Sequence, residues 1–205
     1  MKKSPKLHLS LLLLVLICWG LPSAVADETT DTLDRRPDVI YVPTPQAAVN
    51  RMIELAEIQP GELVYDLGCG DGRIVVTAAQ KHGVRAIGVD IDPVRVEESK
   101  ENVRQAGVEA LVTIEHGDIF DLDLSEADVV FLYLQPRLNE RLMPQLAKMK
   151  PGSRIVSFEF DMGNAEPLLV ERGRFDELSE RRIYKWVVPW EDKTHPDWDI
   201  YMTEP

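Results

Sequence analysis

One short stretch of the chain combines residue types that can surround a small charged ligand. The stretch VYDLGCGDGRIV, residues 64–75, carries the carboxylates Asp66 and Asp71 and three glycines within seven residues. It joins an apolar run of strand type to a run of helical character, so we expect a tight strand-to-helix turn. Glycine lets the backbone approach a ligand closely, and a helix start presents unpaired N–H donors. The pattern therefore predicts a ligand-binding loop.

The glycine spacing distinguishes two kinds of nucleotide ligand. A dinucleotide-binding turn has the pattern G-x-G-x-x-G and aims the helix start at a pyrophosphate. Here the run is GCGDGR, so Arg73 stands in place of the third glycine, and Asp66 and Asp71 would repel a pyrophosphate. Carboxylates suit a ligand with an ammonium or a sulfonium group. S-adenosylmethionine (SAM) carries both, so the loop indicates SAM.

Two further acids end the next two predicted strands. Asp90 ends the strand-like run 85–92, where a carboxylate can accept hydrogen bonds from both ribose hydroxyls. Asp118 ends the run 111–118, where it can accept a hydrogen bond from an adenine amino group. Ligands of doubly wound sheets bind at the carboxyl ends of the strands, so these acids and the loop predict one nucleoside site.

The remaining chain supplies elements that would position this site. Strand and helix patterns alternate through residue 160, which predicts parallel pairing with helical crossovers. Two strand-like runs then follow each other, which predicts an antiparallel hairpin at one edge of the sheet. Thr44 can cap the first helix with Pro45 in its first position, and Pro144 is expected to break the last helix. The expected strands lie within 63–68, 85–92, 111–118, 127–134, 151–160, 166–173 and 181–189.

The N-terminus has the pattern of a secretory signal peptide. Basic residues come first, Leu9–Cys18 is almost wholly apolar, and Ala24, Val25 and Ala26 fit a cleavage site. An uncleaved membrane anchor is the alternative, and either reading places the domain outside the cytoplasm, in the periplasm or another extracytoplasmic space. We expect a signal or anchor at 1–26, a linker at 27–40, the main domain at 41–189 and a tail at 190–205.

The net charge and the positions of the cysteine and histidine residues restrict the function further. All 35 acidic residues follow position 26, against 20 Lys and Arg residues there, so the mature chain has a net charge of −15. That charge argues against nucleic acid as a partner. Cys69 is the single cysteine of the mature chain, so it has no internal disulfide partner. The histidines have no ligand spacing, and no metal site is expected.

Several motifs together resemble those of class I SAM-dependent methyltransferases. They are DLGCGDG, GVDID and GDI, with LAKMKPGSRIV before the fifth strand, and the resemblance covers about residues 41–189. It implies a Rossmann-like, doubly wound α/β sheet of seven strands in the order 3-2-1-4-5-7-6, mostly parallel with an antiparallel last strand. The cofactor residues implied are Asp66, Gly68, Gly70, Asp90 and Asp118.

A narrower resemblance concerns the acceptor. The stretches YVPTP, YDLGCGDGRIV and VVFLYLQP are similar to small protein-lysine methyltransferases, whose mitochondrial relatives modify the ATP synthase c-subunit and the adenine nucleotide translocator. This resemblance implies a protein substrate with an accessible lysine. It also implies that Tyr41 and Thr44 lie over the cofactor.

Methyl transfer from a sulfonium mainly requires alignment of the acceptor and exclusion of water. A lysine must also lose a proton, because its ordinary pKa is ~10.4. The acceptor end should lie at the carboxyl ends of the fourth and fifth strands, where Tyr133, Gln135 and Glu159 are the candidates. The NPPY run that amide and adenine methyltransferases carry after the fourth strand is missing, which disfavours those targets.

Three other functions stay open from the sequence. An exported domain would meet little SAM, so the fold could be a non-catalytic nucleoside-binding or interaction module. The acceptor could be a small molecule. A nicotinamide-dependent oxidoreductase is the third, and Arg73 in place of glycine counts against it.

Overall fold

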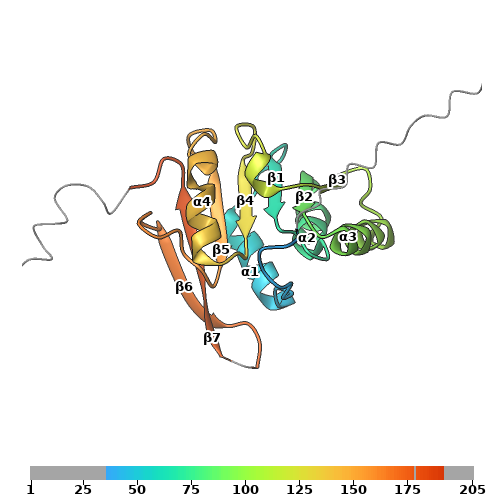
Figure 1. Ribbon diagram of the computed structural model, residues 1–205, viewed down its shortest axis with the longest axis horizontal. Helices are drawn as coiled ribbons and strands as arrows, with labels where there is room; N and C mark the ends of the chain where they lie inside the picture. The colour runs from blue at the N-terminus through green and yellow to red at the C-terminus, as the bar shows by residue number, and fades with distance from the viewer. Residues whose placement is uncertain (1–35, 178, 192–205) are drawn as a thin grey trace, which may run out of the picture. The chain divides into compact units, whose positions relative to one another are not determined.

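The computed structural model describes residues 36–177 and 179–191, and these belong to a single unit of the chain. The expected signal or anchor at 1–26, most of the linker and most of the tail lie outside the described residues. At the centre is a seven-stranded sheet in the order β3-β2-β1-β4-β5-β7-β6 (Figure 1). This is the order that the resemblance to class I methyltransferases implies, so the predicted fold is confirmed.

The first five strands of the sheet run parallel, and β7 is antiparallel to both β5 and β6. In β4 all four residues are buried, as expected of a central parallel strand covered on both faces. The closing hairpin of β6 and β7 is the predicted antiparallel edge. The strands are β1 (Leu63–Leu67), β2 (Arg85–Asp90), β3 (Val112–His116), β4 (Val129–Leu132), β5 (Arg154–Phe158), β6 (Leu169–Arg174) and β7 (Glu180–Val187).

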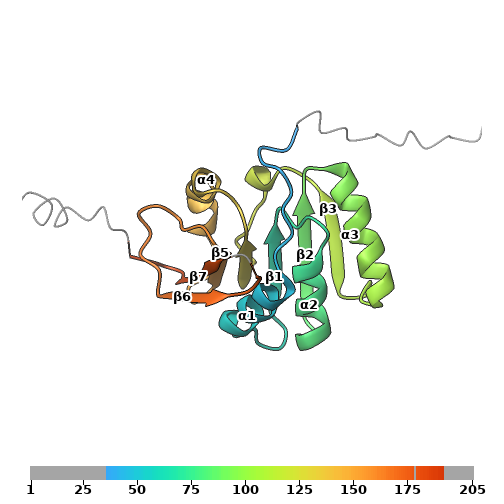
Figure 2. The same ribbon diagram turned by 90° about the horizontal axis from the view of Figure 1, so that it is seen from below.

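Helices cover both faces of the sheet (Figure 2). On one face, α1, α2 and α3 contribute to a core cluster that includes Met52, Val75 and Phe131. On the other face, α4 and the short 3-10 helix η1 pack over a second cluster that includes Leu142 and Trp186. The helices are α1 (Gln46–Ala56), α2 (Arg73–His82), α3 (Pro93–Ala106), η1 (Ile119–Asp121) and α4 (Pro136–Leu146).

Two details of the expected helices are wrong. Thr44 does not cap α1, because Pro45 occupies the N-cap position. Helix α4 continues through Pro144 to Leu146. Pro144 lies in the last turn, where its missing N–H removes a single main-chain hydrogen bond, and the buried Leu142 and Leu146 hold that turn against the sheet.

Candidate active site

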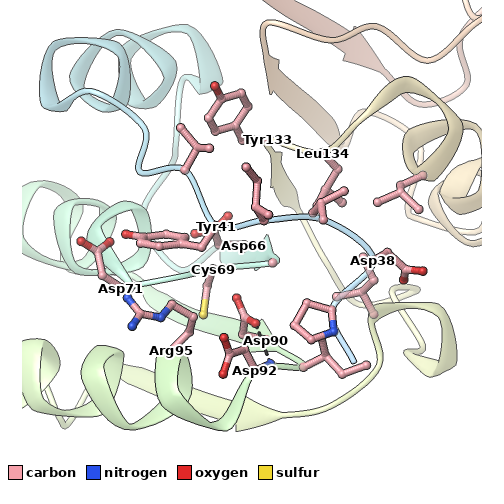
Figure 3. A pocket seen from close by; sticks show the side chains of 18 of the residues that line it. Asp38, Tyr41, Asp66, Cys69, Asp71, Asp90, Asp92, Arg95, Tyr133 and Leu134 are labelled. Carbon is pink, nitrogen blue, oxygen red and sulfur yellow. Dashed lines mark hydrogen bonds between the residues drawn. The ribbon is translucent and has the colours of Figure 1, made fainter. Parts of the chain in front are cut away.

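A pocket opens at the carboxyl ends of β1, β2 and β4, the side of the sheet where the predicted acids lie. The glycine loop after β1 forms its floor, and residues 37–44, which we call the strap, run over it (Figure 3). Asp66, Asp90 and Asp118 all line this pocket, together with Gly68, Tyr41 and Thr44. The structure therefore brings together the acids that the sequence placed at three different strand ends.

The glycine loop has a backbone that only glycine adopts readily. Gly68 and Gly70 have φ values of 78° and 56°, in the left-handed region. The N–H groups of Gly68 and Cys69 both donate to the Val89 carbonyl, at 2.8 and 3.0 Å, which attaches the loop to β2. A β-carbon at Gly70 would lie 2.2 Å from Cε2 of Tyr41, so glycine also permits the close approach of the strap.

Asp90 is buried at the end of β2 and organises the loop. Its Oδ2 accepts a hydrogen bond from the Gly70 N–H at 2.8 Å. Its Oδ1 accepts from the Asp92 N–H at 2.9 Å (Figure 3). A carboxylate has about four acceptor sites, so Asp90, which lines the pocket, has acceptor capacity beyond these two bonds. This geometry fits two ribose hydroxyls.

Asp66 has a different environment. Its side chain is buried, with the residue 3% exposed, and its carboxyl group makes no hydrogen bond to any described residue. Burial, with the nearby charges of Asp90 and Asp71 as smaller causes, raises its pKa to about 8. A buried acid beside two other acids favours a cation, since a positive charge would lower its pKa again. The ammonium group of SAM fits this position.

Arg73 attaches the strap to the glycine loop. Its Nε donates to Oδ1 of Asp71 at 2.9 Å, and its Nη1 donates to the Thr44 carbonyl at 2.8 Å. Burial alone would raise the pKa of Asp71, but the Arg73 guanidinium outweighs it and holds that pKa below its ordinary value. Arg95 adds a second contact, with its guanidinium carbon 4.9 Å from the centre of the Tyr41 ring. The side chain that departs from the dinucleotide pattern thus holds the strap in place.

We expect Arg73→Gln to raise the Kd for SAM about 10-fold, because the strap loses its charged attachment, a loss of about 1.4 kcal/mol. Arg73→Lys should recover part of the affinity, since it keeps the charge without the fork of donors. Arg104→Gln is the matched control, because Arg104 forms an exposed pair with Glu101 on α3. Isothermal titration with SAM measures all three variants. An unchanged Kd in Arg73→Gln would show that this attachment does not support binding.

The structure places the three acceptor-side candidates differently. Tyr133 lines the pocket and packs against Phe158 and Phe160, with ring centroids 5.0 and 6.0 Å away. Gln135 is exposed at the start of α4, outside the pocket lining. Glu159 is also outside it; its N–H donates to the Arg182 carbonyl at 2.7 Å, toward β7. Tyr133 is the one candidate of the three that faces the cofactor pocket.

Sequence reasoning missed the apolar walls of the pocket. Ile91 follows Asp90, and Ile119 and Phe120 follow Asp118; all three line the pocket. These apolar surfaces fit the faces of a flat base, and Asp118, whose carboxylate accepts from the Phe120 N–H at 3.0 Å, lies beside them. The signal in the sequence was an apolar residue directly after Asp90 and after Asp118.

Within residues 36–177 and 179–191, no cluster of three or more His, Cys, Asp or Glu residues could hold a metal ion. None of the helices in these residues is both long and apolar enough to cross a membrane.

Known proteins share this architecture. Residues 66–169 match the family model of the ANTKMT methyltransferase domain. A protein-lysine N-methyltransferase of Saccharolobus islandicus is 42% identical over 74% of this chain and 95% of its own length. The adenine nucleotide translocase lysine N-methyltransferase of Mus musculus is 33% identical over 66% of this chain and 59% of its own.

A solved structure is also similar to this chain. It is an RNA methyltransferase from Salinibacter ruber in complex with S-adenosylhomocysteine, with a TM-score of 0.68 and 43% identity. The match covers 75% of this chain and 98% of that one.

The sheet order, the acid-lined pocket and these relatives together define a SAM-dependent methyltransferase of class I, and SAM is its cofactor. The pocket fits this cofactor, because the buried carboxyl groups of Asp66 and Asp90 line it beside the left-handed turn at Gly68. The chain belongs to the ANTKMT methyltransferase domain family.

Proposed function

We propose that this enzyme methylates lysine side chains of a protein. The observation that carries the proposal is the 42% identity to a protein-lysine N-methyltransferase over most of both chains. The ring of Tyr133, which lines the pocket and packs on Phe158 and Phe160, supports it. An aromatic ring beside an approaching ammonium group removes water from it, and this loss of hydration lowers the pKa of the ammonium group.

The residues of the chain supply positioning in this reaction. Asp66 would face the ammonium of the cofactor, Asp90 its ribose and Asp118 its adenine, while Tyr41 and Thr44 would cover it from the strap. Tyr133 would form part of the pocket wall on the acceptor side. When bound, SAM would supply an activated methyl group to a lysine Nζ that has lost its proton to solvent, with S-adenosylhomocysteine as the leaving group.

RNA is the second candidate acceptor, because the similar Salinibacter ruber structure is described as an RNA methyltransferase. Charge disfavours it for this chain. The formal net charge of the whole chain is −12, and the pocket lining contains six aspartates against two arginines, Arg73 and Arg95. A polyanion would be repelled by this surface, whereas a lysine would be attracted.

The two acceptors are distinguished by the fate of a labelled methyl group. The full chain is incubated with tritium-labelled SAM and a cell extract, and the product is divided between protease and ribonuclease treatment. We expect protease to release the label and ribonuclease to leave it in place. Label released by ribonuclease alone would contradict the lysine proposal.

We also propose that the enzyme acts outside the cytoplasm, exported or held at the membrane by its N-terminal segment. The support is the order of basic start, apolar run and small-residue site in residues 1–26. A C-terminal phosphatase fusion that is active only after export tests this. Activity of the fusion is the expected result, and an inactive fusion that is nevertheless synthesised would contradict export.

A further inference from the structure

The strap exposes apolar side chains at the rim of the cofactor pocket. Ile40 is 86% exposed and Val42 is 50% exposed, while Tyr41 between them lies against Gly70. The other large hydrophobic residues with comparable exposure in the described chain are Val94 on α3 and the Leu168–Val170 run at the β6 edge. Exposed apolar residues grouped at a site of chemistry indicate a binding surface.

The main chain of the strap is also available for binding. Among the described residues, no hydrogen bond involves a backbone N–H or C=O group of residues 39–43. Pro43 restricts Val42 to an extended conformation, and the segment contains no helix. Figure 3 shows it crossing above Asp66 and Asp90. An extended segment with free donors and acceptors is suited to pair with another extended segment.

We propose, on the basis of the lysine methyltransferase function proposed above, that Val39–Val42 bind the acceptor protein as an extended segment. Apolar side chains on either side of the target lysine pack on Ile40 and Val42. The strap would thus select lysines that have apolar neighbours, and it is a specificity-determining surface as well as a cover.

The charge of the chain and the apolar character of the strap favour an extended, lysine-bearing polypeptide as the binding partner. The formal net charge of the chain is −12, so an approaching segment that carries a lysine is attracted to it. Ile40 and Val42 offer no hydrogen-bonding group from their side chains, so the residues beside that cation should be apolar. An extended polypeptide with a lysine between apolar residues meets both requirements and also satisfies the unpaired main chain of the strap.

The test compares two acceptor peptides with the full-length enzyme. One is acetyl-Gly-Leu-Lys-Leu-Gly-amide and the other is acetyl-Gly-Ser-Lys-Ser-Gly-amide, so they differ in the neighbours of the lysine alone. The variant is Ile40→Ser with Val42→Ser. The matched control is Leu168→Ser with Val170→Ser, because these residues are 70% and 45% exposed at the β6 edge. Each enzyme is assayed for kcat/KM on both peptides and for the Kd of SAM.

We expect the wild type and the control to prefer the leucine peptide about 10-fold in kcat/KM, a difference of about 1.4 kcal/mol. The strap variant should lose this preference at saturating SAM, because its KM for the leucine peptide rises to its KM for the serine peptide. Equal kcat/KM values for the two peptides with the wild-type enzyme would overturn the proposal that the strap binds the acceptor. The lysine methyltransferase function would remain in place. Transfer to neither peptide, together with ribonuclease-sensitive label in the extract, would overturn both proposals.

Discussion

Replacing Asp90 with alanine is expected to weaken SAM binding by about 100-fold or more, which corresponds to about 2.8 kcal/mol. The carboxylate offers two acceptor sites to the ribose, and a hydrogen bond to a charged group contributes about 1.5–3 kcal/mol. The same carboxylate holds the N–H groups of Gly70 and Asp92. The variant therefore loses both the contact and the order of the loop. Isothermal titration of the full chain with SAM measures the change.

Asp123→Ala is the matched control for this experiment. Asp123 lies in an exposed loop, and its carboxylate likewise accepts from a backbone N–H, that of Ser125, at 3.0 Å. The control changes the net charge by the same amount but lies outside the pocket lining. Circular dichroism melting shows whether each variant is folded. A folded Asp90→Ala protein that binds SAM within about threefold of wild type would refute the assigned site.

Asp66→Asn should affect stability and binding in opposite directions. Burial raises the pKa of Asp66 to about 8 in the cofactor-free protein, whereas the unfolded chain has the ordinary value of 3.8. The folded state keeps its proton between these values and the unfolded state loses it. The Asp66 contribution to the free energy of unfolding therefore falls as the pH rises from about 4 to about 8, and is level above that. Asparagine carries no charge in either state, so the variant does not lose this part of the free energy of unfolding.

Three measurements check this account of Asp66. At pH 8 and without SAM, the melting temperature of Asp66→Asn should exceed that of wild type by about 5 °C, which corresponds to roughly 2 kcal/mol. SAM should bind the variant about 10-fold more weakly. Below pH 8, titrations in two buffers of different ionisation enthalpy should show that wild type releases protons on binding SAM and that the variant does not. Equal proton release by both proteins would assign the proton to another group.

The sequence was most informative where local pattern determines the structure. The left-handed backbone at Gly68 and Gly70 follows from residue type, and the strand-terminal position of Asp90 follows from the alternation of strands and helices. Parallel strands bring such ends together, so the cofactor pocket could be predicted before its geometry was known. The sheet order was predicted through family resemblance.

Contacts between distant segments could not be predicted. Arg73 was noticed only as a departure from the dinucleotide pattern, because its bond to the Thr44 carbonyl depends on the path of the strap. Glu159 was expected near the acceptor because it follows a strand end. Its left-handed backbone, φ 68°, and its main-chain bond to Arg182 place it beside the closing hairpin instead. Long-range pairing of β5 with β7 decides that orientation.

The most direct test of the central claim is to locate the transferred methyl group by mass spectrometry. The full chain is incubated with SAM carrying a trideuterated methyl group and a protein extract freed of RNA, and the tryptic peptides are sequenced. The account predicts trideuterated methyl groups on lysine Nζ atoms, and none when Asp90→Ala replaces the wild type. Label on any other side chain, or equal lysine labelling by Asp90→Ala, would contradict it.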